Sequence, residues 1–263
     1  MRRRKVNFPV KPLAFVLIIL LALCFILGYI WRILSTSEYF KVKDIVSREA
    51  LSDDLSYLKG KNIFSLNLAK EAAGIARSCP DCSRVRLARI IPDRIFVEFI
   101  RRKPVALIKL YRYFTVDEEG VIFSSSLQPD SSGLPVITGL ETKIFGAKPG
   151  KRYDSRELAV ALLILKEAAK TRLLRDYKIQ KVDISGIDNI TVRIPIPQSQ
   201  AVYANWKAPE KNKFLEIKIG QGNIRDKVAI MAGLINQEKQ KLASIKYIDL
   251  RFNEPVIKFK DDK

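Results

Sequence analysis

Histidine is entirely absent from this chain of 263 residues. Its absence removes the commonest general base, a frequent metal ligand and the central member of Ser-His-Asp and Cys-His catalytic sets. Carboxylate and Ser-Lys chemistry stay open, so an enzyme becomes less expected without being excluded. Acidic side chains are also few, because 28 Asp and Glu stand against 47 Lys and Arg, which gives a formal net charge of +19.

Cysteine is scarce too, with three residues in the chain. Cys24 lies in an apolar run, and the others form the tetrapeptide Cys79-Pro80-Asp81-Cys82. A redox-active pair usually follows a strand at a helix N-terminus, whereas this pair follows a helical pattern and precedes a strand pattern. A zinc site would need two more ligands, and the chain has neither histidine nor a second cysteine pair. The sequence therefore favours a small local disulfide or two free thiols.

An uncharged apolar run occupies residues 13–31 and contains no proline. About 20 apolar residues span a bilayer core as a helix, which satisfies its own backbone hydrogen bonds. We therefore expect a transmembrane helix at residues 13–34 after a basic tail at residues 1–12. Positive charge beside a first apolar helix favours a cytoplasmic N-terminus and an exported remainder. The basic residues of the tail are Arg2, Arg3, Arg4, Lys5 and Lys11.

A cleaved signal peptide is the alternative interpretation of this run. Its apolar region typically has about 7–15 residues and ends in small residues at a cleavage site. Here the run is longer and leads into WRILSTSEY, which lacks such a site. A buried core helix is disfavoured because no face of the segment is polar. The sequence favours a retained anchor.

The positive charge invites a nucleic-acid function, because basic proteins bind phosphate backbones. The predicted export argues against it, since the basic part would not meet chromosomal DNA. Anionic headgroups or cell-wall polymer fit that location better, and a plain solvated surface explains the charge most simply. We therefore expect no nucleic-acid partner.

The first exported stretch predicts a small β-α-α-β-β domain. Alternating residues at 39–46 indicate a strand, and Ser52 with two following acids marks a helix start that ends near Gly60. A second helix is expected at residues 68–77. Basic and apolar residues then alternate at 84–90 and 94–100, which predicts two strands. We expect a three-stranded sheet with helices on one face. The side chains expected to face those helices are Val85, Leu87, Ile95, Val97 and Phe99.

The remaining chain, residues 107–263, predicts a mainly antiparallel sheet with two helices, so the fold class is α+β. Asp154 is expected to cap a helix running to about residue 174, and Asn223 to open the second. The acids at 117–119 are explained by a turn ending at Gly120 more simply than by catalysis. Strands are expected at 105–110, 113–116, 121–123, 134–139, 179–184, 190–194, 201–206, 214–219, 245–252 and 255–259.

The last two predicted strands form the best candidate interaction surface. A strand at the chain end is commonly a sheet edge, and its unpaired backbone groups can be extended by another chain. The alternative is that these strands merely complete the core, and the residues alone leave the two interpretations balanced.

Seven short segments follow one another along the chain, namely 40–45, 60–66, 85–89, 92–97, 102–106, 217–220 and 247–252. In this order they resemble the FtsQ/DivIB family of cell-division proteins. Directly after the anchor they match its POTRA domain, expected here at residues 38–106. A D-x-x-G-x-x-F turn at Asp117 and a Leu-Pro-x-x-x-Gly step at Leu134 match the second domain. The pattern departs at Arg101, at residues 47–49 and at the cysteine pair.

This resemblance implies a non-catalytic scaffold that needs no cofactor. Its partners would be an FtsB-like and an FtsL-like protein at the division septum, with septal wall synthases as further partners. Arg251 would pair with an acidic residue of the partner, and Phe252 would make an aromatic contact. The resemblance weakens beyond Phe252. The implied partner-binding residues are Tyr247, Arg251, Phe252, Glu254, Val256 and Ile257.

Two other functions stay open at this stage. One is a membrane-anchored POTRA module that docks or chaperones exported polypeptides. The other is a wall-modifying enzyme that uses carboxylates. Carboxylates gathered in one pocket would favour the enzyme, whereas an open terminal edge would favour a binding function.

Overall fold

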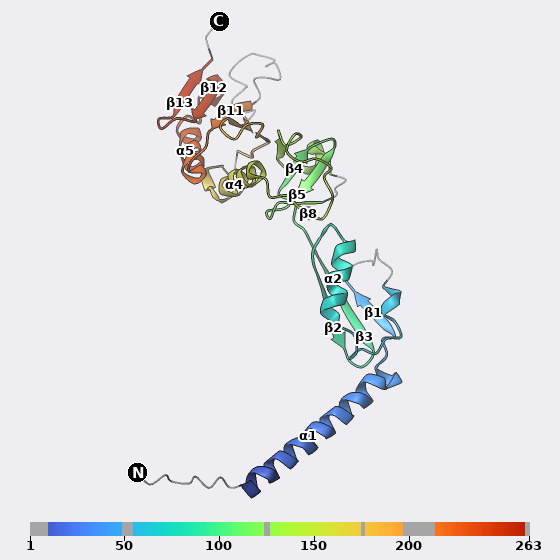
Figure 1. Ribbon diagram of the computed structural model, residues 1–263. Coiled ribbons are helices and arrows are strands. Elements are labelled where there is room, and N and C mark those ends of the chain that lie inside the picture. Colours follow the sequence, from blue (N-terminus) through green and yellow to red (C-terminus); the bar gives the residue numbers. More distant parts are fainter. Residues whose placement is uncertain (1–9, 49–54, 124–126, 175–176, 197–213, 261–263) are drawn as a thin grey trace, which may run out of the picture. The chain divides into compact units, whose positions relative to one another are not determined.

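The structure, a computed structural model, describes residues 10–48, 55–123, 127–174, 177–196 and 214–260 (Figure 1). The predicted helix start at Ser52 and the predicted strand at 201–206 lie outside these residues. The α+β class is confirmed, because one apolar helix precedes strands and a few helices. Backbone contacts divide the chain into two units. The first unit comprises residues 1–78 and 84–100, and the second comprises 79–83 and 101–263.

Helix α1 (Val10–Thr36) contains the predicted anchor. Its segment Ala14–Thr36 is long and apolar enough to cross a membrane, and none of it is buried against protein. At the end of the helix, a polar side chain hydrogen-bonds to the backbone carbonyls. The Asn62 side-chain amide donates to Leu34 O at 2.9 Å and to Ser37 O at 3.3 Å. The bond to Leu34 O satisfies one of the backbone acceptors that a helix end leaves without partners.

The first unit contains a three-stranded sheet in the order β1-β3-β2, with β1 parallel to β3. Its elements are β1 (Asp44–Ser47), α2 (Leu68–Ser78), β2 (Cys82–Ile90) and β3 (Arg94–Arg101). Of the five predicted inward side chains, Val85, Ile95 and Val97 are buried and the other two are half-buried. Ile75 of α2 is buried as well, so α2 contributes to the core of this unit.

Two local predictions for this unit were wrong. The first strand begins at Asp44, because residues before it form a 3-10 turn, η1 (Glu38–Phe40), whose Tyr39 N–H bonds to the Ser37 hydroxyl. The predicted helix that starts at Ser52 was expected to reach Gly60, but its described residues form only the short 3-10 helix η2 (Ser56–Leu58). Gly60, with a φ of 79°, turns the chain directly afterwards.

The second unit is built on one ten-stranded sheet in the order β13-β12-β11-β10-β9-β7-β4-β5-β6-β8. Three neighbouring pairs are parallel, namely β4 with β7, β7 with β9 and β11 with β12, and the others are antiparallel. The strands are β4 (Ala106–Lys109), β5 (Tyr113–Val116), β6 (Val121–Phe123), β7 (Val136–Thr138), β8 (Lys151–Arg152), β9 (Lys181–Asp183), β10 (Ile190–Pro195), β11 (Phe214–Ile219), β12 (Ile245–Leu250) and β13 (Val256–Phe259).

Helices α4 (Arg156–Lys170) and α5 (Ile224–Gln237) contribute their apolar sides to the core of the second unit. The cap of α4 is Ser155 rather than the predicted Asp154, because the Ser155 hydroxyl accepts the Leu158 N–H at 3.1 Å. Helix α5 follows Asn223 as predicted and connects two parallel neighbours, β11 and β12. Parallel strands need such a long crossover. The shorter helical segments are α3 (Pro129–Ser132), η3 (Arg172–Leu174) and η6 (Leu242–Ser244).

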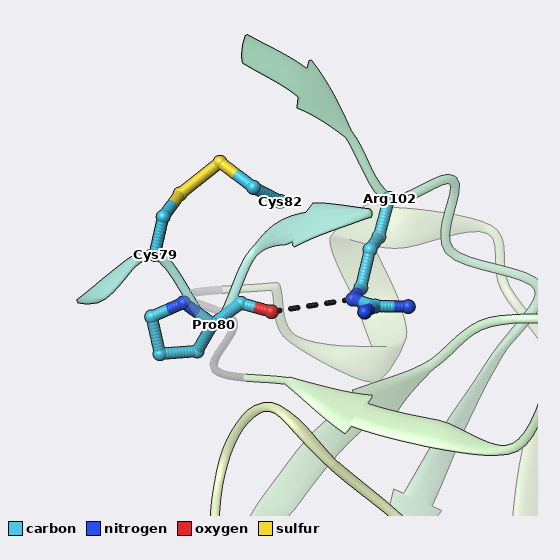
Figure 2. The surroundings of a disulfide bond; sticks show 4 residues. All are labelled: Cys79, Pro80, Cys82 and Arg102. Carbon is cyan, nitrogen blue, oxygen red and sulfur yellow. Dashed lines mark hydrogen bonds between the residues drawn. A yellow bond between two sulfur atoms is a disulfide. The ribbon is translucent and has the colours of Figure 1, made fainter. Parts of the chain in front are cut away.

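Cys79 and Cys82 form a disulfide, which resolves the alternative left by the sequence. Figure 2 shows Arg102 reaching the loop that this disulfide closes. The Arg102 N–H donates to Asp81 O at 2.8 Å, and its Nε donates to Pro80 O at 3.3 Å. Its Nη1 also donates to the buried Asp117 carboxylate. Arg102 therefore joins the disulfide loop to the turn between β5 and β6.

Both oxygens of the Asp117 carboxylate accept hydrogen bonds that shape this turn. Its Oδ1 accepts the N–H groups of Glu119 at 3.0 Å and Val121 at 2.8 Å, while Oδ2 accepts from Arg102. Gly120 adopts a φ of 79°, which favours glycine. These contacts support the interpretation of residues 117–120 as a turn.

Candidate functional site: the terminal sheet edge

The candidate site begins with β12, three of whose six residues are buried apolar side chains. Ile245 and Ile248 are fully buried, and Leu250 is 2% exposed. The register pairs Tyr247 with Lys258 and Ile248 with Ile257 of β13. Strand β12 therefore anchors β13 to the core of the second unit.

A carboxylate, Asp249, interrupts the apolar residues of β12 and is only 5% exposed. Arg251 compensates for this burial. Its Nε and Nη2 donate to Asp249 at 2.9 and 2.6 Å, and its backbone N–H donates at 3.0 Å. The hydrogen bonds from Arg251 hold the pKa of Asp249 below its ordinary value. The same pair raises the pKa of Arg251.

Arg251 is thus already paired within the chain. Its remaining Nη1 lies 3.5 Å from Asn189 Oδ1, and a third of the side chain stays accessible. A contact between Arg251 and an acidic group of a partner remains a prediction. Such a contact would use an arginine already oriented by Asp249, with less ordering on binding.

The loop after β12 exposes an aromatic side chain. Phe252 is 64% exposed, and the Arg251 guanidinium carbon lies 5.6 Å from its ring centroid. Glu254 is exposed in the same loop, and Val256 at the start of β13 is 48% exposed. This corner therefore presents apolar area beside charged groups, which is typical of interface anchors.

Strand β13 is terminal among the described strands of its sheet. The Lys260 N–H donates inward to Ser244 O at 2.8 Å. Because backbone groups alternate along a strand, Ile257 and Phe259 direct their N–H and C=O groups away from β12. In the described part of the chain these groups face outward from the sheet. An added strand could pair with them.

The structure distributes the predicted site residues over two faces and one loop. Directly paired residues share a face, so Tyr247 and Val256 lie on one face, while Ile257 lies on the other beside the core. Arg251, Phe252 and Glu254 lie in the connecting loop. All six belong to the β12–β13 corner, but they do not form one continuous side-chain patch.

Sequence reasoning missed three residues of this corner. Asp249 positions Arg251, Phe259 is 45% exposed on the edge, and the Lys218 ammonium lies 4.5 Å from the Tyr247 ring centroid. One signal was available, because residues two apart on a strand share a face and an Asp-x-Arg spacing there predicts a pair. The contact of Lys218 with Tyr247 depends on sheet order and has no local signal.

Three carboxylates, those of Glu118, Glu119 and Asp154, line a cavity of about 730 Å³ beside α4. Each of them has a cation nearby: Glu118 pairs with Lys166, Glu119 with Arg102 and Asp154 with Arg152. Much of the remaining lining is apolar, including Leu158 and Leu162. Among the described residues, no group of three or more Cys, Asp or Glu could hold a metal ion. Carboxylates that are each paired with a cation resemble surface ion pairs more than the two carboxylates of a general acid–base pair.

The Asp249–Arg251 pair predicts a specific pH dependence. A lowered folded pKa contributes stability above the ordinary carboxyl value of 3.8, and this contribution is lost as pH falls through the folded pKa. We expect Asp249→Asn to lower the free energy of unfolding at neutral pH. We also expect the free energy of unfolding of this variant to fall less steeply than that of the parent as the pH is lowered below about 3.8. Urea unfolding of the detergent-solubilised chain, followed by circular dichroism, measures both. An equally steep dependence of the free energy of unfolding on pH in the variant and the parent would show that Asp249 is not the group responsible.

The described residues form an α+β protein in which one apolar helix, long enough to cross a membrane, precedes a three-stranded and a ten-stranded sheet. Comparison with known proteins gives the particular family. A family model described as "Cell division protein FtsQ/DivIB, C-terminal" matches residues 106–251, more than half of the chain. The chain therefore belongs to the FtsQ/DivIB family of cell division proteins. The match ends at Arg251, so Phe252 and β13 lie beyond it.

Curated relatives extend the similarity over most of the chain. Cell division protein FtsQ of Geotalea daltonii is 23% identical over 239 residues, which cover 88% of this chain and 80% of the relative. The protein of the same name from Syntrophotalea carbinolica is 23% identical over 234 residues, covering 86% and 76%. That of Geobacter sp. is 21% identical over 248 residues, covering 90% and 83%. These relatives support a role in cell division.

Proposed function

We propose that this protein is a non-catalytic scaffold of the division machinery. It would hold an FtsB-like and an FtsL-like protein at the septum and connect cytoplasmic ring assembly to septal peptidoglycan synthesis. Family membership supports the division role, and the apolar helix supports attachment to the inner membrane. The basic tail favours a cytoplasmic N-terminus, with the chain that follows α1 on the outer side of the membrane. In this arrangement the folded units act by contact with other division proteins and with septal wall synthases.

The observation that carries the proposal is the outward-facing edge of β13. Ile257 and Phe259 offer backbone donors and acceptors to an added strand, which would supply affinity through main-chain hydrogen bonds. The exposed Phe252 and Val256 flank this edge and would supply side-chain specificity. Arg251, fixed by Asp249, adds a charged contact at the corner. These features suit capture of a partner segment by strand addition.

Site-specific photo-crosslinking in cells tests this proposal. A benzoylphenylalanine at Phe259 of the full chain is expected to form a covalent adduct with an FtsB-like protein. Tyr111 is the matched control, because it is an aromatic residue of the same unit and is 69% exposed. Adduct formation at Phe259 but not at Tyr111 supports the edge as the site. Equal yields at both positions, or an adduct with unrelated exported polypeptides, would overturn it.

A further inference from the structure

Within the first unit, the part that follows α1 is joined to the end of this helix by side-chain contacts as well as by the chain itself. Asn62 donates to Leu34 O and Ser37 O, and the Phe64 ring packs edge-on against Trp31 with centroids 6.2 Å apart. Phe64 also contacts Phe40 at 5.1 Å. The segment around Phe64 is therefore held against the last turns of the membrane helix.

These contacts fix where the residues around Phe64 lie relative to the bilayer. Trp31 lies near the end of the apolar segment, where aromatic rings favour the headgroup zone. A side chain in ring contact with Trp31 lies at a similar depth, so Phe64 is placed at the membrane surface. The end of the first unit that carries Phe64 therefore faces the bilayer.

The turn between β2 and β3 lies at this same end of the sheet. Strands β1 and β3 are parallel, and their first residues, Asp44 and Arg94, are register partners. Strand β1 starts only a few residues after Phe40, so the start of β3 also lies at the membrane end. The Lys43 N–H donates to Asp93 O at 2.8 Å, which ties the turn to the chain leaving α1.

This turn exposes large apolar side chains. Ile90 is 41% exposed and Ile91 is 65% exposed. The exposed basic residues of the turn and its adjoining segments include Lys43, Lys59, Lys61 and Arg94. Asp93 in the turn pairs with Lys43 at 3.1 Å and with Arg94 at 4.0 Å, so the positive charge that is not paired with it comes from Lys59 and Lys61. Apolar side chains flanked by Lys and Arg are the composition of segments that enter the interface of an anionic bilayer.

We propose that the β2–β3 turn, through Ile90 and Ile91, inserts into the headgroup region of the bilayer that α1 spans. The depth would be about 5–10 Å, as for other apolar side chains at the interface. Helix α1 and this turn then hold the first unit at two points and restrict its tilt on the membrane. Neighbouring lysines add attraction to anionic headgroups. This inference depends on the membrane helix and is independent of partner capture at β13.

A fluorescent label whose emission depends on its depth in the bilayer tests whether the turn inserts. The full chain with Cys24→Ala and Ile91→Cys is labelled with an NBD fluorophore without reductant, so that the Cys79–Cys82 disulfide is retained. It is then reconstituted into vesicles of phosphatidylethanolamine and phosphatidylglycerol. Arg84→Cys is the matched control, because Arg84 is exposed at the other end of β2, about 20 Å along the strand.

We expect the label at Ile91 to be blue-shifted and quenched several-fold more strongly by lipids with a doxyl group near the headgroup than the label at Arg84. Ile90→Cys provides a second position with the same expected result, and circular dichroism checks that each variant folds. Emission at Ile91 equal to that at Arg84 would overturn the proposal. So would protection that appears only when native membrane proteins are added, because the turn would then bind protein.

Discussion

Replacing Arg102 by alanine is expected to lower the free energy of unfolding of the second unit by about 3–5 kcal/mol. The side chains of Arg102 and Asp117 are 13% and 6% exposed, so the substitution leaves a buried carboxylate without its cation. It also removes the guanidinium bond to Pro80 O, which ties the disulfide loop to the sheet. Urea unfolding of the purified chain, followed by circular dichroism, measures the effect.

Lys103→Ala is the matched control for this prediction, because Lys103 is an adjacent basic residue that is exposed. We expect its effect to be small, as for most surface substitutions. The Arg102→Ala/Asp117→Ala double variant then separates the pair from the other contacts. A loss for Arg102→Ala no larger than that for Lys103→Ala would show that the pair does not stabilise this turn.

Replacing Phe252 by alanine is expected to weaken capture of an FtsB-like partner about 30-fold, which corresponds to ~2 kcal/mol. The reason is its 64% exposure at the corner of the open edge, where an aromatic ring could be buried on binding. The fold should be unaffected, because the ring is not part of the core. Biolayer interferometry with the full chain in nanodiscs and the purified pair of proposed FtsB-like and FtsL-like partners measures the affinity.

Phe145→Ala is the matched control for partner capture, because Phe145 is 78% exposed in the same unit and lies outside the β12–β13 corner. Unchanged affinity for Phe252→Ala, or equal losses for both variants, would remove Phe252 from the site. Arg251→Glu is a less specific test. It would place a second carboxylate beside buried Asp249 and disturb β12 itself.

The local elements of the fold were largely predictable from the sequence. The apolar run predicts α1, residues 68–77 nearly match α2, and the predicted strands at 113–116, 121–123 and 214–219 agree with β5, β6 and β11. These elements follow from periodicity and from turn residues such as Gly120. Errors occurred where one side chain decided a boundary, as at Ser37 before η1 and Ser155 before α4.

The candidate site was predictable as a segment but not as a surface. The sequence identifies the terminal strands, yet it cannot say that β13 is a sheet edge or that Ile257 faces the core while Val256 does not. It also gives no sign that Arg251 is occupied by Asp249, because that depends on how deeply Asp249 is buried. Sheet order and burial arise from contacts between residues distant in the chain.

Composition, charge and local periodicity thus determined on their own that this is an α+β protein with an apolar N-terminal helix long enough to cross a membrane. They did so because membrane spans, helices and strands depend on neighbouring residues. Only the tertiary structure decided the Cys79–Cys82 disulfide, the Arg102–Asp117 pair, the parallel pairing of β11 with β12 and the exposed edge at β13. Each of these depends on distances and burial that packing sets.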